Sequence, residues 1–143
     1  MLVEDSADDE RLMFRVLAAT DAAERIVVAR DGDEALTALF GRIPDEDTVP
    51  VIDPVVVIAD LKLPKRNGID VLKAIRANRY TCSLPFVILT SSDQESDIRE
   101  SYQYGVNSYV CKPVTFAELQ DAVRQIENYW LRTNVAPAPV RAI

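Results

Sequence analysis

Five side chains that could carry chemistry follow the expected ends of four buried strands: Glu4, Asp5, Asp60, Thr90 and Lys112. Three carboxylates held close together repel one another, and a hard divalent cation bound by oxygen makes such a cluster tolerable. Mg²⁺ suits the set best, because it accepts a few carboxylates and keeps positions open for water or phosphate oxygens. A lysine ammonium neutralises an anion, and a threonine hydroxyl donates to it. The set therefore predicts a Mg²⁺-dependent site for a phosphoryl group.

Asp60 is the best candidate for the nucleophile in this set. Residues 55–58 are all β-branched, which is typical of a central parallel strand that is buried on both faces. Asp60 follows this strand, and Pro64, Asn67 and Gly68 then turn the chain. An Asp in this place can also be a simple turn former, so the functional interpretation depends on the other strands. The reaction it predicts is in-line phosphoryl transfer to Asp60, with the metal and Lys112 neutralising the transferred oxygens.

A parallel sheet is needed to bring these side chains together. Apolar runs bounded by turn residues predict strands at 1–3, 25–29, 55–58, 86–89 and 107–110. Apolar residues at helical spacing predict helices at 7–19, from the turn at 31–33 to Gly41, at 69–78, at 94–104 and at 115–131. We expect Phe116 to belong to the apolar stripe of the last helix, and we expect the helix at 94–104 to pack most loosely. The alternation predicts one α/β domain with helices on both faces of the sheet.

Composition and charge narrow the classes of function. The 143 residues form one domain, and a net charge of −7 without clustered Lys or Arg excludes a nucleic-acid surface. No leader and no apolar run of membrane-spanning length is found, so we expect a cytoplasmic protein with no membrane contact. Cys82 and Cys111 are expected to be free thiols. Pro137 and Pro139 indicate a flexible tail at 133–143 after a domain at 1–132, with no output domain.

Four motifs at these strand ends together resemble the receiver domain of two-component response regulators. They are LVEDS at 2–6, the apolar strand into Asp60 followed by LKLPKRNG, LTS at 89–91, and YVCKP at 109–113. Each motif alone is common, but all four in order, each closing a strand, are highly specific. The similarity extends from residue 1 to about Leu131. It implies a flavodoxin-like (βα)5 doubly wound sheet with strand order 2-1-3-4-5.

The resemblance also implies a role for individual residues, with Asp60 accepting a phosphoryl group from a histidine kinase. The implied Mg²⁺ ligands are Asp5 and Asp60 directly, Glu4 through water, and the backbone carbonyl of Lys62. Thr90 and Tyr109 would form the switch pair, whose hydroxyl and ring move when Asp60 is phosphorylated. The Lys112–Pro113 bond is expected to be cis. Lys62 and Ser92 stand where the family varies, and we predict that the lifetime of the phosphoryl group depends on Lys62.

The stretch at 126–131, IENYWL, narrows the resemblance to stand-alone regulators paired with bacterial phytochromes. This implies a sensor histidine kinase of the phytochrome type as partner. It also implies a homodimer through the face formed by 94–104, 107–110 and 115–131, which would change on phosphorylation. Candidate contact residues are Phe14, Tyr102, Tyr129 and Trp130. The last two rings could instead cover the bottom of the sheet, since aromatic residues at helical spacing are usually core.

Other classes of function remain as alternatives. A pseudo-receiver that binds partners without phosphorylation would have lost an acid or the lysine, and neither is lost here. A hydrolase with an aspartate nucleophile needs a second acid shortly after Asp60, where Lys62 stands. A flavin-binding domain needs a phosphate loop after the first strand, where Ala7 and Asp8 stand. The phosphoacceptor would catalyse its own phosphorylation and dephosphorylation without turning over a separate substrate.

Overall fold

The computed structural model describes residues 1–18 and 25–138, and within them strands and helices alternate along the chain. The elements are β1 (Leu2–Val3), α1 (Ala7–Ala18), β2 (Val28–Ala29), α2 (Gly32–Phe40), β3 (Val57–Ala59), α3 (Gly68–Ala77), β4 (Phe86–Thr90), α4 (Glu95–Gln103), β5 (Ser108–Cys111), α5 (Phe116–Glu127) and a short π-helix, η2 (Asn128–Thr133). All neighbouring strands are parallel, in the order β2-β1-β3-β4-β5. The predicted strand order and fold class are confirmed.

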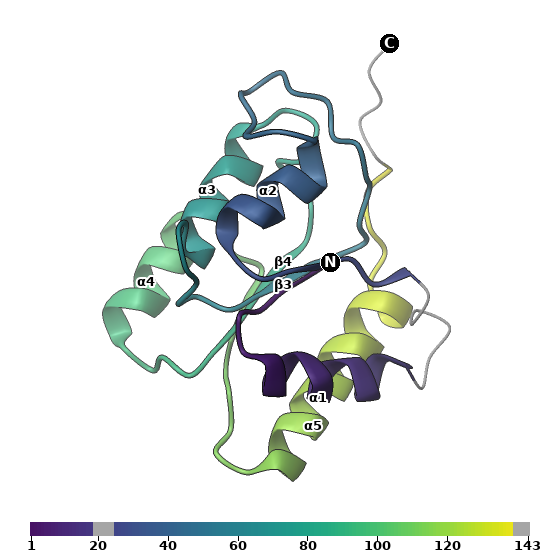
Figure 1. The fold of residues 1–143 in the computed structure, drawn as a ribbon, viewed down its shortest axis with the longest axis vertical. Helices are drawn as coiled ribbons and strands as arrows, with labels where there is room; N and C mark the ends of the chain where they lie inside the picture. The colour runs from purple at the N-terminus through teal and green to yellow at the C-terminus, as the bar shows by residue number, and fades with distance from the viewer. Residues whose placement is uncertain (19–24, 139–143) are drawn as a thin grey trace.

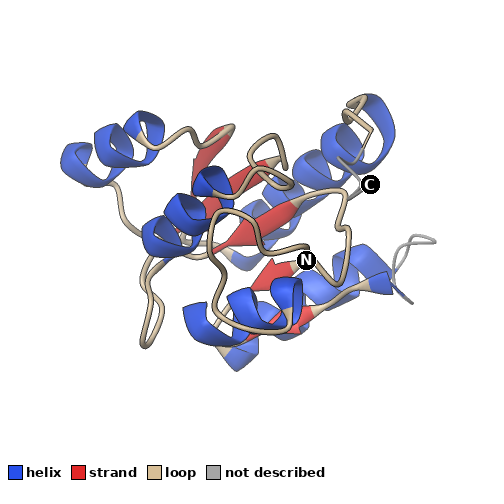
Figure 2. Cartoon of the chain, turned by 90° about the horizontal axis from the view of Figure 1, so that it is seen from above, coloured by secondary structure: helices blue, strands red, loops and turns tan. Residues whose placement is uncertain are grey.

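Helices cover both faces of the sheet. Helices α1 and α5 lie side by side on one face, and α2 and α3 lie together on the other (Figure 1). Seen from above, the strands lie between these helical layers (Figure 2). Successive strand residues point to opposite faces. On β3, Val57 and Ala59 therefore join the core under α2 and α3, while Ile58 joins the core under α1 and α5.

The first strand is one residue shorter than the predicted strand at 1–3, but its hydrogen bonds extend beyond it. Ile58 donates to the carbonyl of Met1 (2.9 Å), and Leu2 donates to the carbonyl of Val27 (2.8 Å). In register, Leu2 lies opposite Ile58, between β2 and β3. The residues that follow β1 are therefore anchored from both sides, despite the two-residue strand.

Two burial predictions are wrong, and both concern residues at the ends of elements. Val55 is 51% exposed, because β3 begins only at Val57 and Val55 belongs to the loop that leads into it. Phe116 is 58% exposed, because it is the first residue of α5 and lies one turn before Leu119, the first buried residue of that helix. The rest of the α5 stripe packs as expected, with Val123 and Ile126 buried.

Element boundaries differ from the prediction by a few residues. The strand expected at 25–29 is limited to Val28–Ala29, and α4 is one residue shorter at each end than the helix expected at 94–104. The only buried residue of α4 is Ser101, as its sparse apolar pattern predicts. Helical structure continues through η2 to Thr133, and 134–138 have no regular secondary structure. Ala19, Pro139 and the rest of the expected tail lie outside the described residues.

Arg76 of α3 forms hydrogen bonds with the segments that lead into β4 and β5, at the amino-terminal side of the sheet. Its guanidinium donates to the carbonyl of Leu84 (2.7 Å), the carbonyl of Gly105 (3.0 Å) and the side-chain oxygen of Asn107 (2.9 Å). Burial lowers the pKa of Arg76, because the guanidinium gives up part of its hydration. Three accepting oxygens from separate segments replace this water, so Arg76 fixes α3 against the segments around β4 and β5.

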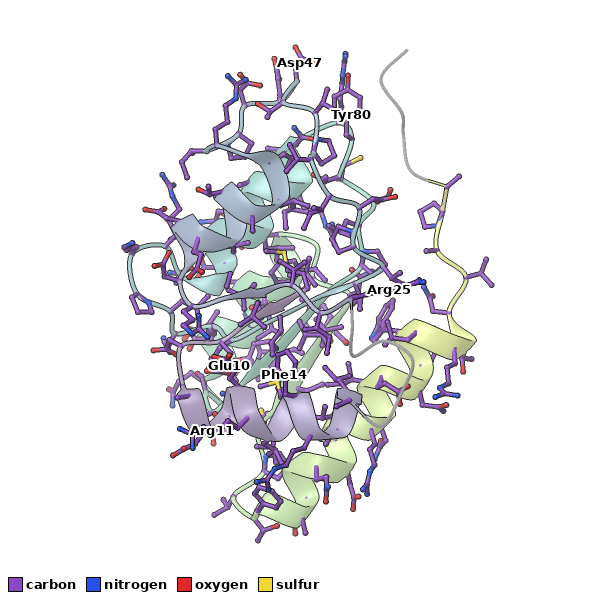
Figure 3. The ribbon with its side chains drawn as sticks, turned by 45° about the vertical axis from the view of Figure 1, so that its right-hand side comes forward. Glu10, Arg11, Phe14, Arg25, Asp47 and Tyr80 are labelled. Atoms are coloured by element: carbon purple, nitrogen blue, oxygen red, sulfur yellow. The ribbon has the colours of Figure 1, made fainter. Side chains whose placement is uncertain are left out.

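Three further observations concern the far end of the molecule, the cysteines and the helices. Asp47 and Tyr80 lie at the opposite end of the molecule from α1 (Figure 3), where Arg79 pairs with Asp47 at 3.1 Å. Cys82 and Cys111 are free and exposed, as predicted. Among the described helices, none has the length and apolar character that crossing a membrane requires.

Candidate functional site

The predicted site residues meet at the carboxyl edge of the sheet because backbone hydrogen bonds fix where each strand ends. The amide of Asp60 donates to the carbonyl of Val3 on β1 (2.9 Å), and the amide of Lys112 donates to the carbonyl of Thr90 on β4 (2.7 Å). The amide of Glu4 donates to the last carbonyl of β2 (2.9 Å). Residues far apart in the sequence are thus brought to one edge by the register of the strands.

Lys112 is the centre of this site. Its ammonium nitrogen lies 2.8 Å from Glu4, 2.7 Å from Asp9 and 2.8 Å from Asp60, and its side chain is only 6% exposed. Burial lowers the pKa of Lys112, but the hydrogen bonds to the three carboxylates outweigh that effect and raise the pKa above its usual value. The ammonium is therefore charged at every physiological pH, and it neutralises part of the acidic cluster.

Glu4 is the most buried acid of the cluster. One carboxylate oxygen accepts from the amide of Ser6 (3.0 Å), and the other accepts from Lys112 (2.8 Å). Burial raises the pKa of Glu4, and the hydrogen bond from Lys112 opposes that rise. The buried carboxylate of Glu4 therefore depends on Lys112 for compensation of its charge.

The donor set fits a divalent cation. Glu4, Asp5 and Asp60 each offer a carboxylate oxygen, and these oxygens lie within 4.8 Å of one another. Asp5 is exposed, so one side of the cluster is open to water. An ion with hard oxygen ligands and retained water fits this arrangement. The amide of Lys62 donates to Oδ1 of Asp60 (3.3 Å), which places this residue beside the same carboxylate. The ligand role of its carbonyl stays a prediction.

The turn after β3 holds Asp60 against the start of α3. A Cβ atom on Gly68 would lie 2.4 Å from the carbonyl oxygen of Asp60, so only glycine allows α3 to begin here. Asn67 caps the helix with a reciprocal capping box. The ammonium of Lys65 pairs with Asp31, the cap of α2, at 3.1 Å. The loop that carries Asp60 into α3 is therefore fixed from two helices.

The expected switch residues meet at Ser92 rather than at each other. The hydroxyl of the buried Thr90 accepts from the amide of Ser92 (3.3 Å), and the hydroxyl of Tyr109 donates to the carbonyl of Ser92 (2.9 Å). Burial raises the pKa of Tyr109, so the phenol stays protonated and able to donate. The hydroxyl of Ser92 donates to Asp97 of α4 (2.5 Å), which also pairs with Lys62 (3.3 Å).

Sequence reasoning missed Asp9 and Asp97 as members of this site. Asp9 is one of the acids in the first turn of α1, and its contact with Lys112 joins residues 103 apart in the sequence, so no local spacing indicates it. The contact between Asp97 and Lys62 joins two separate segments, and no spacing within the sequence indicates it.

The Lys112–Pro113 peptide bond is trans, so the predicted cis geometry is wrong; the described residues contain no cis peptide bond. The trans form is the intrinsically favoured one. In this form the backbone of Lys112 continues the pairing of β5 with β4, and its side chain still reaches the three carboxylates.

A groove of about 480 Å³ opens beside Lys112. It lies between α1 and the segment from β5 to the first turns of α5, and its lining includes Arg11, Asp9, Val114 and Phe116. Val114 and Phe116 are exposed apolar side chains, and Arg11 extends outward from α1 (Figure 3). The groove therefore combines an apolar rim and a cationic group beside Lys112 and Asp9.

The four candidate contact residues differ in exposure. Tyr102 of α4 and Tyr129 of η2 are exposed, while Phe14 of α1 is half-buried. Trp130 is half-buried and packs on the core under α1 and α5, with its ring edge-to-face with Tyr129 at a centroid distance of 4.9 Å. The prediction that the ring covers the bottom of the sheet therefore fits the half-buried Trp130 but not Tyr129. The rings of Tyr102 and Tyr129 are accessible to a partner.

Sheet order and the acidic strand-end site define a flavodoxin-like, doubly wound α/β protein of the receiver type. The family model for the response regulator receiver domain matches residues 1–124, and the chain belongs to this family. Receiver domains bind a divalent metal in an acidic pocket and interact with histidine kinases.

Individual relatives match nearly the whole chain. The chain is 36% identical over 139 residues to the probable methanogenesis regulatory protein FilR2 of Methanothrix harundinacea, over 97% of this chain and 87% of that protein. It is 36% identical over 138 residues to the response regulator Rcp1 of Synechocystis sp., over 96% of this chain and 92% of Rcp1.

Solved structures agree with the sequence comparison. The phosphorylated cyanobacterial phytochrome response regulator RcpA matches with a TM-score of 0.86 at 34% identity, over 96% of each chain. The Mn²⁺-bound form of Rcp1 matches with a TM-score of 0.82 at 35% identity, also over 96% of each chain.

Proposed function

We propose that this protein is a response regulator whose Asp60 accepts a phosphoryl group from a sensor histidine kinase in a Mg²⁺-dependent reaction. The observation that carries the proposal is the contact of the buried Lys112 ammonium with Asp60 at 2.8 Å, next to carboxylates that fit a divalent cation. A nucleophilic carboxylate, a fixed cation and a metal site are the parts that phosphoryl transfer to aspartate requires.

The proposed step forms a bond between one carboxylate oxygen of Asp60 and phosphorus. The bond from phosphorus to the histidine nitrogen of the kinase breaks, and its electron pair stays on the imidazole. Asp5 and Asp60 directly, Glu4 through water and the carbonyl of Lys62 would hold Mg²⁺, which neutralises charge on the phosphoryl oxygens.

Two further groups of this chain act on the transferred phosphoryl group. Lys112 donates to one of its oxygens from a position that is already fixed before the reaction. The hydroxyl of Thr90, which accepts from Ser92 in this structure, turns to donate to another oxygen. The amide of Ser92 then loses the hydroxyl of Thr90 as its acceptor. A shift of Ser92 would in turn weaken the hydrogen bond that Tyr109 donates to the carbonyl of Ser92. The face formed by α4, β5 and α5 carries the signal.

The groove beside Lys112 is the proposed docking place for the kinase. A helix face of the kinase would cover its apolar rim, which lies beside Lys112, and Lys112 in turn contacts Asp60. We assign the kinase to the phytochrome type, because RcpA, which matches nearly the whole chain, is named as a phytochrome response regulator. The response regulator Rcp1 matches the chain over a similar length. FilR2 has the same sequence identity to this chain as Rcp1 and is not named for a phytochrome. The phytochrome input therefore depends on the similarity to RcpA.

The proposal extends to assembly and location. A homodimer would form through the face made by α4, β5 and α5, where Tyr102 of α4 is exposed, and would extend to the exposed Tyr129 of η2, which follows α5. Residues 1–132 would act as the receiver domain, with 133–143 as a tail. The protein would act in the cytoplasm, where ATP supplies the kinase, and it would turn over no substrate other than its own phosphoryl group.

The test is intact mass spectrometry after incubation with Mg²⁺ and acetyl phosphate. We expect the gain of one phosphoryl group, which is lost in Asp60→Asn and in a sample with chelator. The absence of a gain in folded protein would contradict the proposal and favour the pseudo-receiver alternative. Sedimentation with and without acetyl phosphate tests the dimer, with Tyr102→Ala as the interface variant.

A further inference from the structure

Asp9 contacts the catalytic lysine although no motif assigns it a role. It lies in the first turn of α1, and its carboxylate is 2.7 Å from the ammonium of Lys112, as close as the carboxylate of Asp60. Its side chain is 30% exposed and lines the groove beside the site. Asp9 is not among the three carboxylates whose oxygens gather at the metal-binding position.

The contact with Asp9 occupies one of the three N–H donors of Lys112. An ammonium group has three N–H donors, and in this structure Lys112 contacts three carboxylates, those of Glu4, Asp9 and Asp60. Each donor therefore has a charged acceptor before any phosphoryl group arrives. A phosphoryl oxygen can receive a hydrogen bond from Lys112 only if one of these contacts is released.

The three contacts differ in what their release costs. The carboxylate of Glu4 is fully buried and accepts from Ser6 and Lys112, so release of Lys112 would leave a buried charge with one partner fewer. Asp60 carries the phosphoryl group itself and must stay beside Lys112. Asp9 is partly exposed and faces the groove, so water can solvate its carboxylate when the lysine leaves. Its release is the least costly of the three.

We propose that Asp9 is a positioning residue that holds the third donor of Lys112 in the resting state and yields it to a phosphoryl oxygen when Asp60 is phosphorylated. This inference rests on the proposed function. In the test reaction an oxygen of Asp60 bonds to phosphorus, the bond from phosphorus to the acetate oxygen breaks, and acetate leaves with the electron pair. Lys112 keeps its protons and exchanges only an acceptor.

The inference makes Asp9 a restraint on phosphorylation. Asp9→Asn removes the charged competitor for Lys112, so we expect phosphorylation by acetyl phosphate to become about tenfold faster. A factor of about ten corresponds to the free energy of one charge-assisted hydrogen bond that no longer has to be broken. Asp9→Glu restores a carboxylate and should return the rate toward that of the parent protein. Asp9→Ala is a second neutral variant in case Asp9→Asn folds poorly.

The neighbouring acid supplies a matched control. Asp8 lies in the same helical turn, but its side chain is 92% exposed and its ion pair with Arg11 is long, at 3.9 Å. Asp8→Asn removes the same charge without touching Lys112. We expect it to change the rate by less than about twofold, because exposed charges are screened.

The measurements are the initial rate of phosphoryl gain by intact mass at saturating Mg²⁺, and the affinity for Mg²⁺ by calorimetry without a phosphoryl donor. Faster phosphorylation in Asp9→Asn with little change in Mg²⁺ affinity is the expected result. If both neutral variants react no faster than Asp8→Asn, or if they bind Mg²⁺ much more weakly, the inference is overturned while phosphorylation of the parent protein still supports the proposed function. If the parent protein gains no phosphoryl group, the proposed function fails and the inference fails with it.

Discussion

Replacing Lys112 by methionine tests whether this residue neutralises the acidic cluster. Methionine keeps much of the length and apolar volume of the lysine stem, so the change removes mainly the ammonium. Lys112 compensates carboxylates on three segments, and its side chain is nearly inaccessible to water. The variant leaves the buried carboxylate of Glu4 with only the amide of Ser6 as partner.

The expected loss can be worked from these contacts. Removing one partner of a buried ion pair costs about 3–5 kcal/mol, because the other charge stays behind uncompensated. A domain of this size is stable by about 5–15 kcal/mol, so Lys112→Met should remove a large part of the free energy of unfolding. Lys73→Met is the matched control. Lys73 pairs with Glu100 at 3.6 Å on the surface, and its removal should cost less than about 1 kcal/mol.

The pH dependence follows from Glu4. Burial already raises the pKa of Glu4 above its usual value of 4.5, and loss of the lysine raises it further. The folded state then binds this proton more tightly than the unfolded state does, so stability falls as the pH rises above 4.5. The deficit of Lys112→Met should therefore be largest at neutral pH and should shrink as the pH falls toward the usual pKa of a glutamate.

Urea unfolding at neutral and mildly acidic pH, with and without Mg²⁺, measures these effects. Mg²⁺ should stabilise Lys112→Met more than the parent protein, since the variant lacks the competing cation at the site. A variant within about 1 kcal/mol of the parent protein at neutral pH would refute the reasoning, because that is the range of an exposed ion pair. A deficit that does not shrink at lower pH would refute the part assigned to Glu4.

Three further substitutions test the supports of the site. Tyr109→Phe removes the hydrogen bond to Ser92 and should cost about 1 kcal/mol in urea unfolding; a cost near zero would mean that the phenol is equally well solvated by water. Arg76→Met leaves three acceptors without their donor and should cost about 2–3 kcal/mol, whereas a neutral change would show that α3 is held by packing alone. Gly68→Ala forces a Cβ against the carbonyl of Asp60 and should cost about 1–3 kcal/mol and slow phosphorylation by acetyl phosphate; unchanged stability and rate would show that the turn can shift freely.

The gathering of the main site residues could be predicted from the sequence because it depends on strand order and strand ends. Asp60, Thr90 and Lys112 each follow an apolar run, and parallel strands must end at one edge. The apolar pattern determines both the strands and their faces, so no knowledge of side-chain distances is needed. This is why the placement of these residues agrees with the structure, while their chemical roles stay proposals.

What the sequence could not supply depends on contacts between segments. In the sequence, Asp9 is one of three acids in the first turn of α1, where negative charge favours the start of a helix. Only its contact with Lys112 in the folded protein distinguishes it from Asp8. Val55 and Phe116 have the apolar character of core residues, but their exposure is decided by where an element begins relative to the edge of the sheet. Hydrophobic pattern alone is least informative at such ends.

The two carboxylate oxygens of Asp60 are held by different parts of the molecule. Oδ2 accepts from Lys112, whose other contacts include Asp9 on α1, and Oδ1 accepts from the amide of Lys62 in the loop after β3. A change of charge on Asp60 therefore acts on two routes. The route to α1 passes through the buried ammonium of Lys112, so salt screens it less than it screens an exposed ion pair.

The route to α4 has two branches of unequal strength. One passes through the ion pair of Lys62 with Asp97, but the side chain of Lys62 is 70% exposed, so water and salt screen most of its interaction. The other belongs to the proposed function and would begin with the hydroxyl of Thr90, which is buried and accepts from Ser92, the residue that also bonds to Asp97 and Tyr109. Because a buried hydrogen bond is costly to leave unmade, the turn of the Thr90 hydroxyl that belongs to the proposed function would act on Ser92 and its contacts more strongly than a change in the exposed ion pair.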